Sequence, residues 1–239
     1  MPGKVIKFPI SNSHSNMSIE GNLAIPDNPI GIVIFAHGSG STRNSERNKL
    51  VSEKLNNSHI ATLLFDLLSI EEQQYDTKLE KMDLKVPGAI LNKFNIMLLT
   101  KRLSMVTEWV GRDPSTEKLS VGYFASSTGA AAALISASRF NIVSIVIRSG
   151  RTDLIEDLYL NKIVSPCLFI VGGKEKLLVQ VGNEALRKLR NSKEKDLNIV
   201  KNASHLFEEQ GTMEEVSEIT TRWMLRHFMS DSNSTVKEN

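Results

Sequence analysis

The stretch SVGYFASSTGAAAAL, residues 120–134, contains two adjacent serines between an apolar run and an alanine-rich run. The first run is typical of a buried strand and the second of a helix, so the serines lie at a strand-to-helix turn. A nucleophilic serine in such a turn needs small residues two positions before and after it, because strand and helix backbones come close. Ser127 has alanine and glycine there, whereas Ser126 has phenylalanine and threonine. The pattern therefore selects Ser127 as the candidate nucleophile.

A structural role for the same serines has to be weighed against this. Serine is a favoured N-cap residue, so the pair could simply begin the alanine-rich helix. Ala125 also stands where nucleophile turns usually have glycine, a difference of one methyl group. A short motif cannot separate the two roles. The decision depends on whether catalytic partners follow in the right order along the chain.

The rest of the chain alternates short apolar runs with amphipathic helical patterns. Two segments of period two at the N-terminus, joined by a polar loop at 11–16, predict an antiparallel hairpin. The later alternation predicts an α/β fold whose mostly parallel, doubly wound central sheet has helices on both faces. The expected buried strands are 31–36, 60–68, 119–125, 142–147, 167–171 and 197–200. One helix is expected to end near residue 57, and the others are expected near 94–111, 127–137, 180–190 and 212–228.

Length and composition are typical of one large domain, which we place at residues 1–229. The charged, less regular segment 69–92 is expected to be a small cap excursion with a Pro-Gly turn rather than a second domain. The polar end, residues 230–239, is predicted to be disordered.

Charge and cysteine content restrict the possible partners and location. The formal net charge is only +2, so we expect neither a nucleic-acid partner nor binding to an anionic membrane. No run of about 18 uncharged apolar residues predicts a membrane span, and the first residues do not resemble a secretory signal. The single cysteine excludes an intramolecular disulfide and fits a reducing compartment. We therefore expect a cytoplasmic protein.

A serine nucleophile on an α/β fold needs an acid after a later strand and a histidine later still. Only two histidines follow Ser127. His227 lies in the last amphipathic helix, whereas His205 lies in a loop after a predicted strand and is therefore the candidate base. Glu175 follows a buried strand and a Gly-Gly turn, where the third member should emerge. Asp153, after the preceding strand, is the alternative acid.

Two N–H groups are also needed to bind the oxyanion that forms during acyl transfer. The backbone N–H of Thr128 follows the nucleophile and supplies one. The HGSGS loop after strand 31–36 should supply the other, and we choose the N–H of Ser39. We expect Gly38, Gly40 and Ser41 to contact the substrate, since glycine lets a backbone approach closely.

Several other polar residues are expected to have structural roles. His37 precedes the nucleophile by a whole βαβ unit, so it is interpreted as holding its loop rather than as the base. Glu208 and Glu209 are expected to cover the N-terminus of the final helix, where negative charge is favourable. Arg151 is expected to pair with a nearby carboxylate such as Asp153.

Taken together, these segments resemble the dienelactone hydrolase-like branch of the α/β-hydrolases. The resemblance covers about residues 31–225 and includes FAHGSGSTRNSERN, VGYFASSTGAAAAL, LFIVGGKE and ASHLFEE. It implies Ser127, Glu175 and His205 as nucleophile, acid and base. This chain departs from the family pattern at three places. The namesake enzymes use cysteine as nucleophile, Ala125 replaces the first glycine of the motif, and close relatives usually have aspartate where Glu175 stands.

The resulting expectation is a carboxylic ester hydrolase that acts on small or short-chain esters without metal or organic cofactor. Its expected partner is a small-molecule ester, and monomer and homodimer both stay open. Two other classes are kept beside it. One is a catalytically silent binding protein on the same scaffold, favoured by Ala125 and Glu175. The other is acyl transfer or peptide hydrolysis by the same residues.

Overall fold

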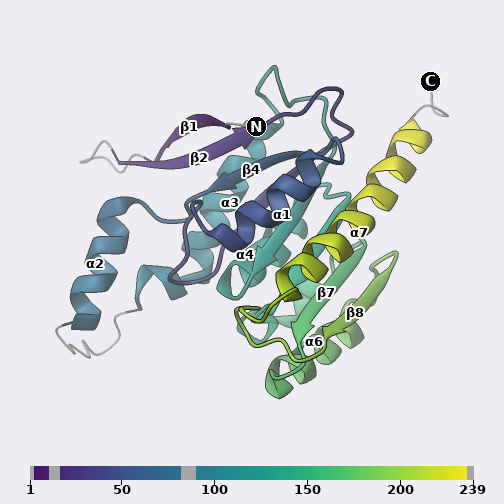
Figure 1. Ribbon diagram of the computed structural model, residues 1–239. Coiled ribbons are helices and arrows are strands. Elements are labelled where there is room, and N and C mark those ends of the chain that lie inside the picture. The colour runs from purple at the N-terminus through teal and green to yellow at the C-terminus, as the bar shows by residue number, and fades with distance from the viewer. Residues whose placement is uncertain (1–2, 11–16, 82–89, 236–239) are drawn as a thin grey trace.

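The computed structural model describes residues 3–10, 17–81 and 90–235 (Figure 1). Its strands form one sheet in the order β1-β2-β4-β3-β5-β6-β7-β8. The first two strands form the predicted antiparallel hairpin, β2 is antiparallel to β4, and all later neighbours are parallel. The strands are β1 (Lys4–Pro9), β2 (Ser18–Ala24), β3 (Ile32–Ala36), β4 (Ala61–Phe65), β5 (Val121–Ser126), β6 (Ser144–Arg148), β7 (Cys167–Gly172) and β8 (Lys195–Val200).

Helices connect the parallel strands and cover both faces of the sheet, as expected. They are α1 (Glu46–Asn56), α2 (Ile70–Lys81), α3 (Ile96–Val110), α4 (Thr128–Ala137), α5 (Asp157–Leu160), α6 (Lys176–Lys188) and α7 (Thr212–Thr235), with short 3-10 turns at Asn92–Phe94 and Thr152–Leu154. The α/β prediction with a mostly parallel, doubly wound sheet is confirmed.

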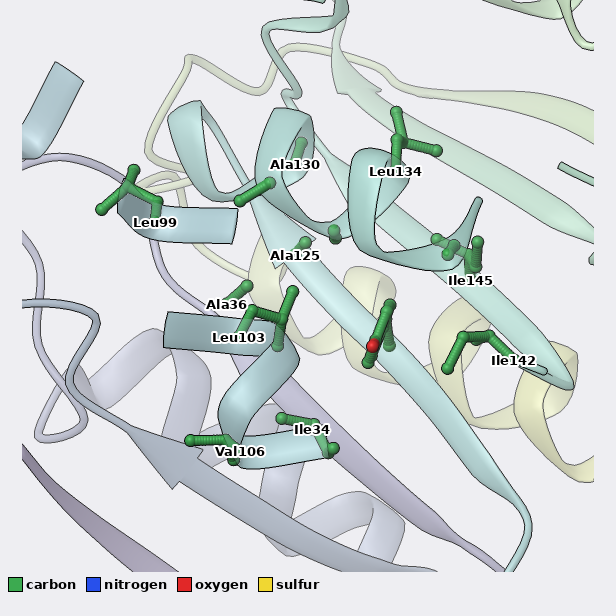
Figure 2. Close-up of a cluster of buried hydrophobic side chains, with 14 of the residues drawn as sticks. Ile34, Ala36, Leu99, Leu103, Val106, Ala125, Ala130, Leu134, Ile142 and Ile145 are labelled. Carbon is green, nitrogen blue, oxygen red and sulfur yellow. The ribbon is translucent and has the colours of Figure 1, made fainter. Parts of the chain in front are cut away.

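The core lies on the two faces of the sheet, because side chains along a strand point alternately to either side. On one face, α1 and α7 pack together over a cluster that includes Phe35 and Phe124, whose ring centroids are 5.0 Å apart. On the other face, α3 and α4 cover Tyr123 and Ala125. Figure 2 shows Ala125 between the strands and α4 in this second cluster.

The segment 69–92 differs from its predicted irregular form, because residues 70–81 form the regular helix α2. A reciprocal pair of hydrogen bonds begins this helix: Ser69 N–H donates to Glu72 Oε2 at 2.8 Å, and Glu72 N–H donates to Ser69 Oγ at 3.2 Å. This is a capping box, a signal legible in the sequence as Ser-x-x-Glu. Figure 1 shows α2 standing away from the sheet. The predicted turn at 87–88 lies outside the described residues.

The tail also differs from its prediction, since α7 extends to Thr235. Two side chains near residue 230 explain the extra turns. Ser230 Oγ donates to the carbonyl oxygen of Arg226 at 2.8 Å, and Ser120 Oγ donates to the carboxylate of Asp231 at 2.6 Å. The second bond fastens the helix end to the beginning of β5. Disorder is therefore wrong for 230–235, and 236–239 lie outside the described residues.

The sheet topology gathers four loops at one edge. In a parallel sheet the carboxyl ends of the strands lie on the same side, and ligand sites of open α/β sheets form there. The loops after β3, β5, β7 and β8 carry the residues selected from the sequence, and β7 and β8 are neighbours. The fold thus assembles the candidate residues from widely separated parts of the chain.

Candidate active site

Ser127 occupies a strained turn between β5 and α4. Its φ and ψ are 49° and −124°, a conformation that non-glycine residues seldom adopt. Although it stands at the N-cap position of α4, its side chain makes no capping hydrogen bond. Its backbone N–H instead donates to the carbonyl oxygen of Arg148 at 3.3 Å. Strain of this kind accumulates at functional positions, so the geometry favours the nucleophile over the helix cap.

Close packing around Ser127 explains the small residues near it. A Cβ at Gly129 would lie 2.4 Å from the carbonyl oxygens of both Ala36 and His37. A Cβ at Gly38 would lie 2.7 Å from Cβ of Ser127. Glycine is thus required at 129 by the backbone at the end of β3 and at 38 by the side chain of Ser127.

Ala125 tolerates its methyl group for a local reason. It belongs to the regular strand β5, where glycine offers no conformational advantage, and its side chain is fully buried in the core cluster (Figure 2). The departure from glycine at this position is therefore compatible with the turn that follows it.

His205 and Glu175 come from the adjacent loops after β8 and β7. Nδ1 of His205 lies 3.5 Å from Oε2 of Glu175, and the side chains are 38% and 32% exposed. Glu175 is the N-cap residue of α6 but makes no side-chain capping bond, so its carboxylate is available to the histidine. The alternative acid, Asp153, is instead held bidentately by Arg151 at 2.7–3.1 Å.

The hydrogen bonds of Arg151 hold the pKa of Asp153 below its ordinary value. Of the two candidate acids, Glu175 is the one that the structure brings to His205. Within the described part of the chain, no hydrogen bond joins the Ser127 side chain to His205. Catalytic hydrogen bonds commonly form or shorten only when substrate binds.

The two candidate oxyanion donors lie at the start of α4 and in the loop after β3. Thr128 is the first residue of α4, where backbone N–H groups have no acceptor within the helix. The N–H of Ser39 already donates to Thr128 Oγ1 at 3.0 Å. Gly40 has φ of +75°, and a Cβ there would meet no atom within 4 Å, so glycine is favoured by backbone conformation alone. Ser39 is therefore close to the expected place, but its N–H has a partner.

His37 holds the loop after β3, as the sequence predicted. The N–H of Leu67 donates to its Nε2 at 3.0 Å, so the proton is on Nδ1, which donates to the carbonyl oxygen of Gly38 at 2.9 Å. Burial lowers the pKa of His37 below 6.5. A neutral imidazole with both nitrogens engaged cannot serve as the base.

A cavity of about 250 Å³ adjoins the predicted oxyanion loop. The loop from His37 to Thr42 and Thr128 form one wall, and α2 forms another. The rest of the lining combines three leucines with five polar or charged side chains and consists of Leu67, Leu68, Gln73, Asp76, Thr77, Glu80, Lys93 and Leu99. Gly38, Gly40 and Ser41 thus line a cavity, while Ser127, His205 and Glu175 stand outside this lining.

Glu209 has a role that the sequence did not indicate. Its carboxylate accepts hydrogen bonds from Ser204 N–H at 2.9 and 3.1 Å and from Lys174 Nζ at 2.8 Å. These bonds, that of Lys174 first, lower the pKa of Glu209 to about 2. Glu208 is 68% exposed and lies 3.9 Å from Arg47. The carbonyl oxygen of Glu209 accepts from the N–H and the hydroxyl of Thr212, at 3.1 and 2.7 Å, so the residue lies at the N-terminus of α7 as expected while its carboxylate has other partners.

Comparison with solved structures first defines the class. The chain superposes on an esterase of Pyrococcus furiosus with a TM-score of 0.72, covering 95% of this chain and 92% of that one at 18% identity. A lid-free α/β serine hydrolase of Xanthomonas campestris gives a TM-score of 0.67 at 15% identity, with 95% and 96% covered. The fold is that of the α/β-hydrolases.

A more similar structure defines the family. Dienelactone hydrolase from Anabaena variabilis is 37% identical, with a TM-score of 0.80, over 93% of this chain and 98% of that one. The chain belongs to the dienelactone hydrolase-like α/β-hydrolases. No protein-family model matches it. Among the described residues, no helix is long and apolar enough to cross a membrane.

Two curated relatives from Mycobacterium tuberculosis are 42% identical over 212 residues, and both are provisionally named as phosphoribosyl transferases. The match covers 88% of this chain but only 44% of each relative. The chain therefore spans less than half the length of these relatives.

Proposed function

We propose that the chain is a carboxylic ester hydrolase that works through an acyl-Ser127 intermediate. The observation that carries the proposal is the conformation of Ser127, with φ of 49° and ψ of −124° and no capping bond. A serine that only began a helix would gain its stability from that bond and would need no strain. Similarity to esterases and other serine hydrolases supports the same class of reaction.

The proposed steps follow from the roles of three side chains. His205 takes the hydroxyl proton as Oγ of Ser127 attacks the ester carbonyl, and then gives it to the departing alkoxide. Water, activated by the same histidine, attacks the acyl-enzyme and releases the acid. Glu175 orients the imidazole and stabilises its positive charge through Nδ1, across a separation of 3.5 Å.

The oxyanion would be bound by the N–H groups of Thr128 and Ser39. The N–H of Ser39 donates to Thr128 Oγ1. When the oxyanion forms, it has to accept from this N–H either together with Thr128 Oγ1 or in its place. Loss of one such donor typically costs about 3–4 kcal/mol of transition-state stabilisation. Before substrate binds, the hydrogen bond to the hydroxyl of Thr128 keeps the N–H of Ser39 oriented.

The cavity beside the oxyanion loop supports small esters as the substrate class. Its volume of about 250 Å³ is below the range of about 300–1,000 Å³ common for drug-sized ligands. The leucines at 67, 68 and 99 would contact an acyl chain, and the polar groups of α2 would contact oxygen atoms of the substrate. No cofactor is needed for this chemistry.

Phosphoribosyl transfer, the reaction in the name of the curated relatives, is not proposed for this chain. More than half of each relative lies outside the match, whereas the strained Ser127 and the pairing of His205 with Glu175 favour acyl transfer. A catalytically silent binding protein is a second candidate, and the observation in its favour is that no hydrogen bond joins the side chains of Ser127 and His205 among the described residues.

Hydrolysis of p-nitrophenyl acetate tests the proposal. We expect Ser127→Ala to fall to background while Ser126→Ala, a buried neighbour, keeps most of the wild-type rate. A fluorophosphonate should label wild type at residue 127 and leave Ser127→Ala unlabelled. Failure of the wild-type protein to be labelled supports the silent binding protein, and equal turnover by wild type and Ser127→Ala would make Ser127 a helix cap.

A further inference from the structure

We propose that Glu209 is a positioning residue that holds the His205 loop against the Glu175 loop. The proposal rests on the proposed function, because it concerns how the candidate base and acid are kept together. Glu209 contacts neither of these side chains directly. It acts through Ser204, which precedes the histidine, and Lys174, which precedes the acid.

The contacts of Glu209 join two loops that are far apart in the sequence. Both carboxylate oxygens accept from the backbone N–H of Ser204, and one also accepts from its hydroxyl at 3.2 Å. On the other side, Oε1 accepts from Lys174 Nζ at 2.8 Å. One carboxylate thus binds the backbone of the residue before His205 and the side-chain ammonium of the residue before Glu175.

Backbone packing shows that the same two loops need a close fit. The N–H of Lys174 donates to the carbonyl oxygen of Ala203 at 3.1 Å. A Cβ at Gly172 would lie 2.5 Å from that oxygen and 2.6 Å from the carbonyl oxygen of Ser204. The loops therefore touch through their backbones, and a small displacement of one moves the other.

The backbone of this loop is well held, but the side chain of His205 is not. Asn202 and Phe207 on either side of His205 have φ of 62° and 55°, the left-handed region, which asparagine adopts readily and phenylalanine seldom does. His205 itself is 38% exposed, and its ion-pair distance to Glu175 is 3.5 Å. The imidazole is thus held only by a long ion pair, and the carboxylate of Glu209 adds a restraint on the backbone of the preceding residue, Ser204.

The charge of Glu209 makes this restraint durable. Its pKa of about 2, set first by Lys174 and then by Ser204, keeps the carboxylate ionised throughout the neutral range. Charge-assisted bonds of this kind are shorter and stronger than neutral ones. Displacement of a catalytic group by about 1 Å can cost about 10²-fold in rate, so the restraint bears directly on turnover.

Three variants test the proposal on p-nitrophenyl acetate. Glu209→Gln removes the charge but keeps the side-chain size, and we expect kcat to fall about 10- to 100-fold with KM within about twofold. Glu208→Gln is the matched control, because its side chain is 68% exposed, and it should keep the wild-type kcat. Lys174→Met removes only the second arm and should lower kcat by a smaller factor.

Folding and local order are measured alongside the rates. The melting temperature of each variant should stay within a few degrees of wild type, while amide hydrogen exchange at Ser204 should become faster in Glu209→Gln. If that variant fails to fold, Lys174→Met carries the test, since its side chain is 55% exposed. A kcat equal to that of Glu208→Gln, or a change confined to KM, overturns the proposal.

Fluorophosphonate labelling separates failure of this proposal from failure of the proposed function. If wild type is labelled quickly and Glu209→Gln slowly, both stand. If the two proteins are labelled at the same rate, the nucleophile is retained and the positioning role of Glu209 is rejected. If wild type is not labelled at all, the proposed function fails, and the positioning role falls with it.

Discussion

The α-carbon of Gly129 faces the carbonyl oxygen of Ala36 so closely that a Cβ would lie 2.4 Å away. This contact joins the beginning of α4 to the end of β3 and sets the turn in which Ser127 lies. We expect Gly129→Ala to lower the free energy of unfolding by about 3 kcal/mol or more, because backbone atoms must move. Urea denaturation measures the change.

Ala125→Gly is the matched variant on the other side of the turn. It restores the glycine usual in such turns, but removes a fully buried methyl group from β5. We expect a loss of about 1–2 kcal/mol, from lost burial and greater freedom of the unfolded chain, with little change in ester hydrolysis. A more stable Ala125→Gly protein would mean that the methyl group strains the turn.

Much of this fold was predictable because its signals are local. Buried parallel strands are continuous apolar runs, and the small neighbours of Ser127 follow from how closely strand and helix pack at such a turn. The capping box at Ser69 and Glu72 was also legible, yet the charged composition of the segment obscured it. Local patterns thus give the elements and the turn that displays the serine.

The missed features depend on contacts between distant residues. Ser39 N–H is occupied by a hydroxyl 89 positions away, and no periodicity encodes that pairing. Glu209 lies just before α7, where an acidic residue is favourable because of the helix dipole. The sequence alone therefore offers no reason to expect other partners for its carboxylate. Only the packing of the loops after β7 and β8 shows that its carboxylate has other partners.

Burial of His37 should make folding stability depend on pH. Its pKa is lowered in the folded protein by burial, whereas in the unfolded chain it is near 6.5. The unfolded state therefore binds the proton first as the pH falls, so stability should decrease below about pH 6.5 and continue to decrease until the folded pKa is reached.

The contribution of His37 is about 1.4 kcal/mol for each unit by which its pKa is lowered. We expect His37→Gln to be less stable than wild type at pH 7, because hydrogen bonds to the Leu67 and Gly38 backbone are lost. The difference between the two proteins should shrink at pH 5. Urea denaturation at both pH values checks this, and a constant difference would show that His37 does not titrate differently on folding.

Arg148 is a buried cation without an acidic partner among the residues that the structure describes. Its guanidinium lies 6.0 and 5.9 Å from the ring centroids of Phe124 and Phe207, and Nη1 lies 3.4 Å from Met213 Sδ. Burial, followed by repulsion from Arg47, lowers its pKa to about 10. An uncompensated charge of this kind costs free energy of folding.

We therefore expect Arg148→Met, which keeps an unbranched side chain of similar reach, to raise the free energy of unfolding by about 1 kcal/mol or more. Denaturation should be measured in a buffer free of phosphate and sulfate, so that no anion pairs with the guanidinium. A loss of stability would instead mean that the contacts with the two aromatic rings outweigh the cost of burying the charge.

Cys167 offers a test that separates serine from cysteine chemistry. It is the only cysteine of the chain, lies fully buried in β7, and has a thiol pKa raised by burial to about 12. Since the thiolate is the reactive form, iodoacetamide should not label the folded protein and should label it fully in urea. Ester hydrolysis should be unchanged after native-state iodoacetamide treatment and abolished by a fluorophosphonate. Native-state labelling with a matching loss of hydrolysis would contradict both the burial of Cys167 and the role of Ser127.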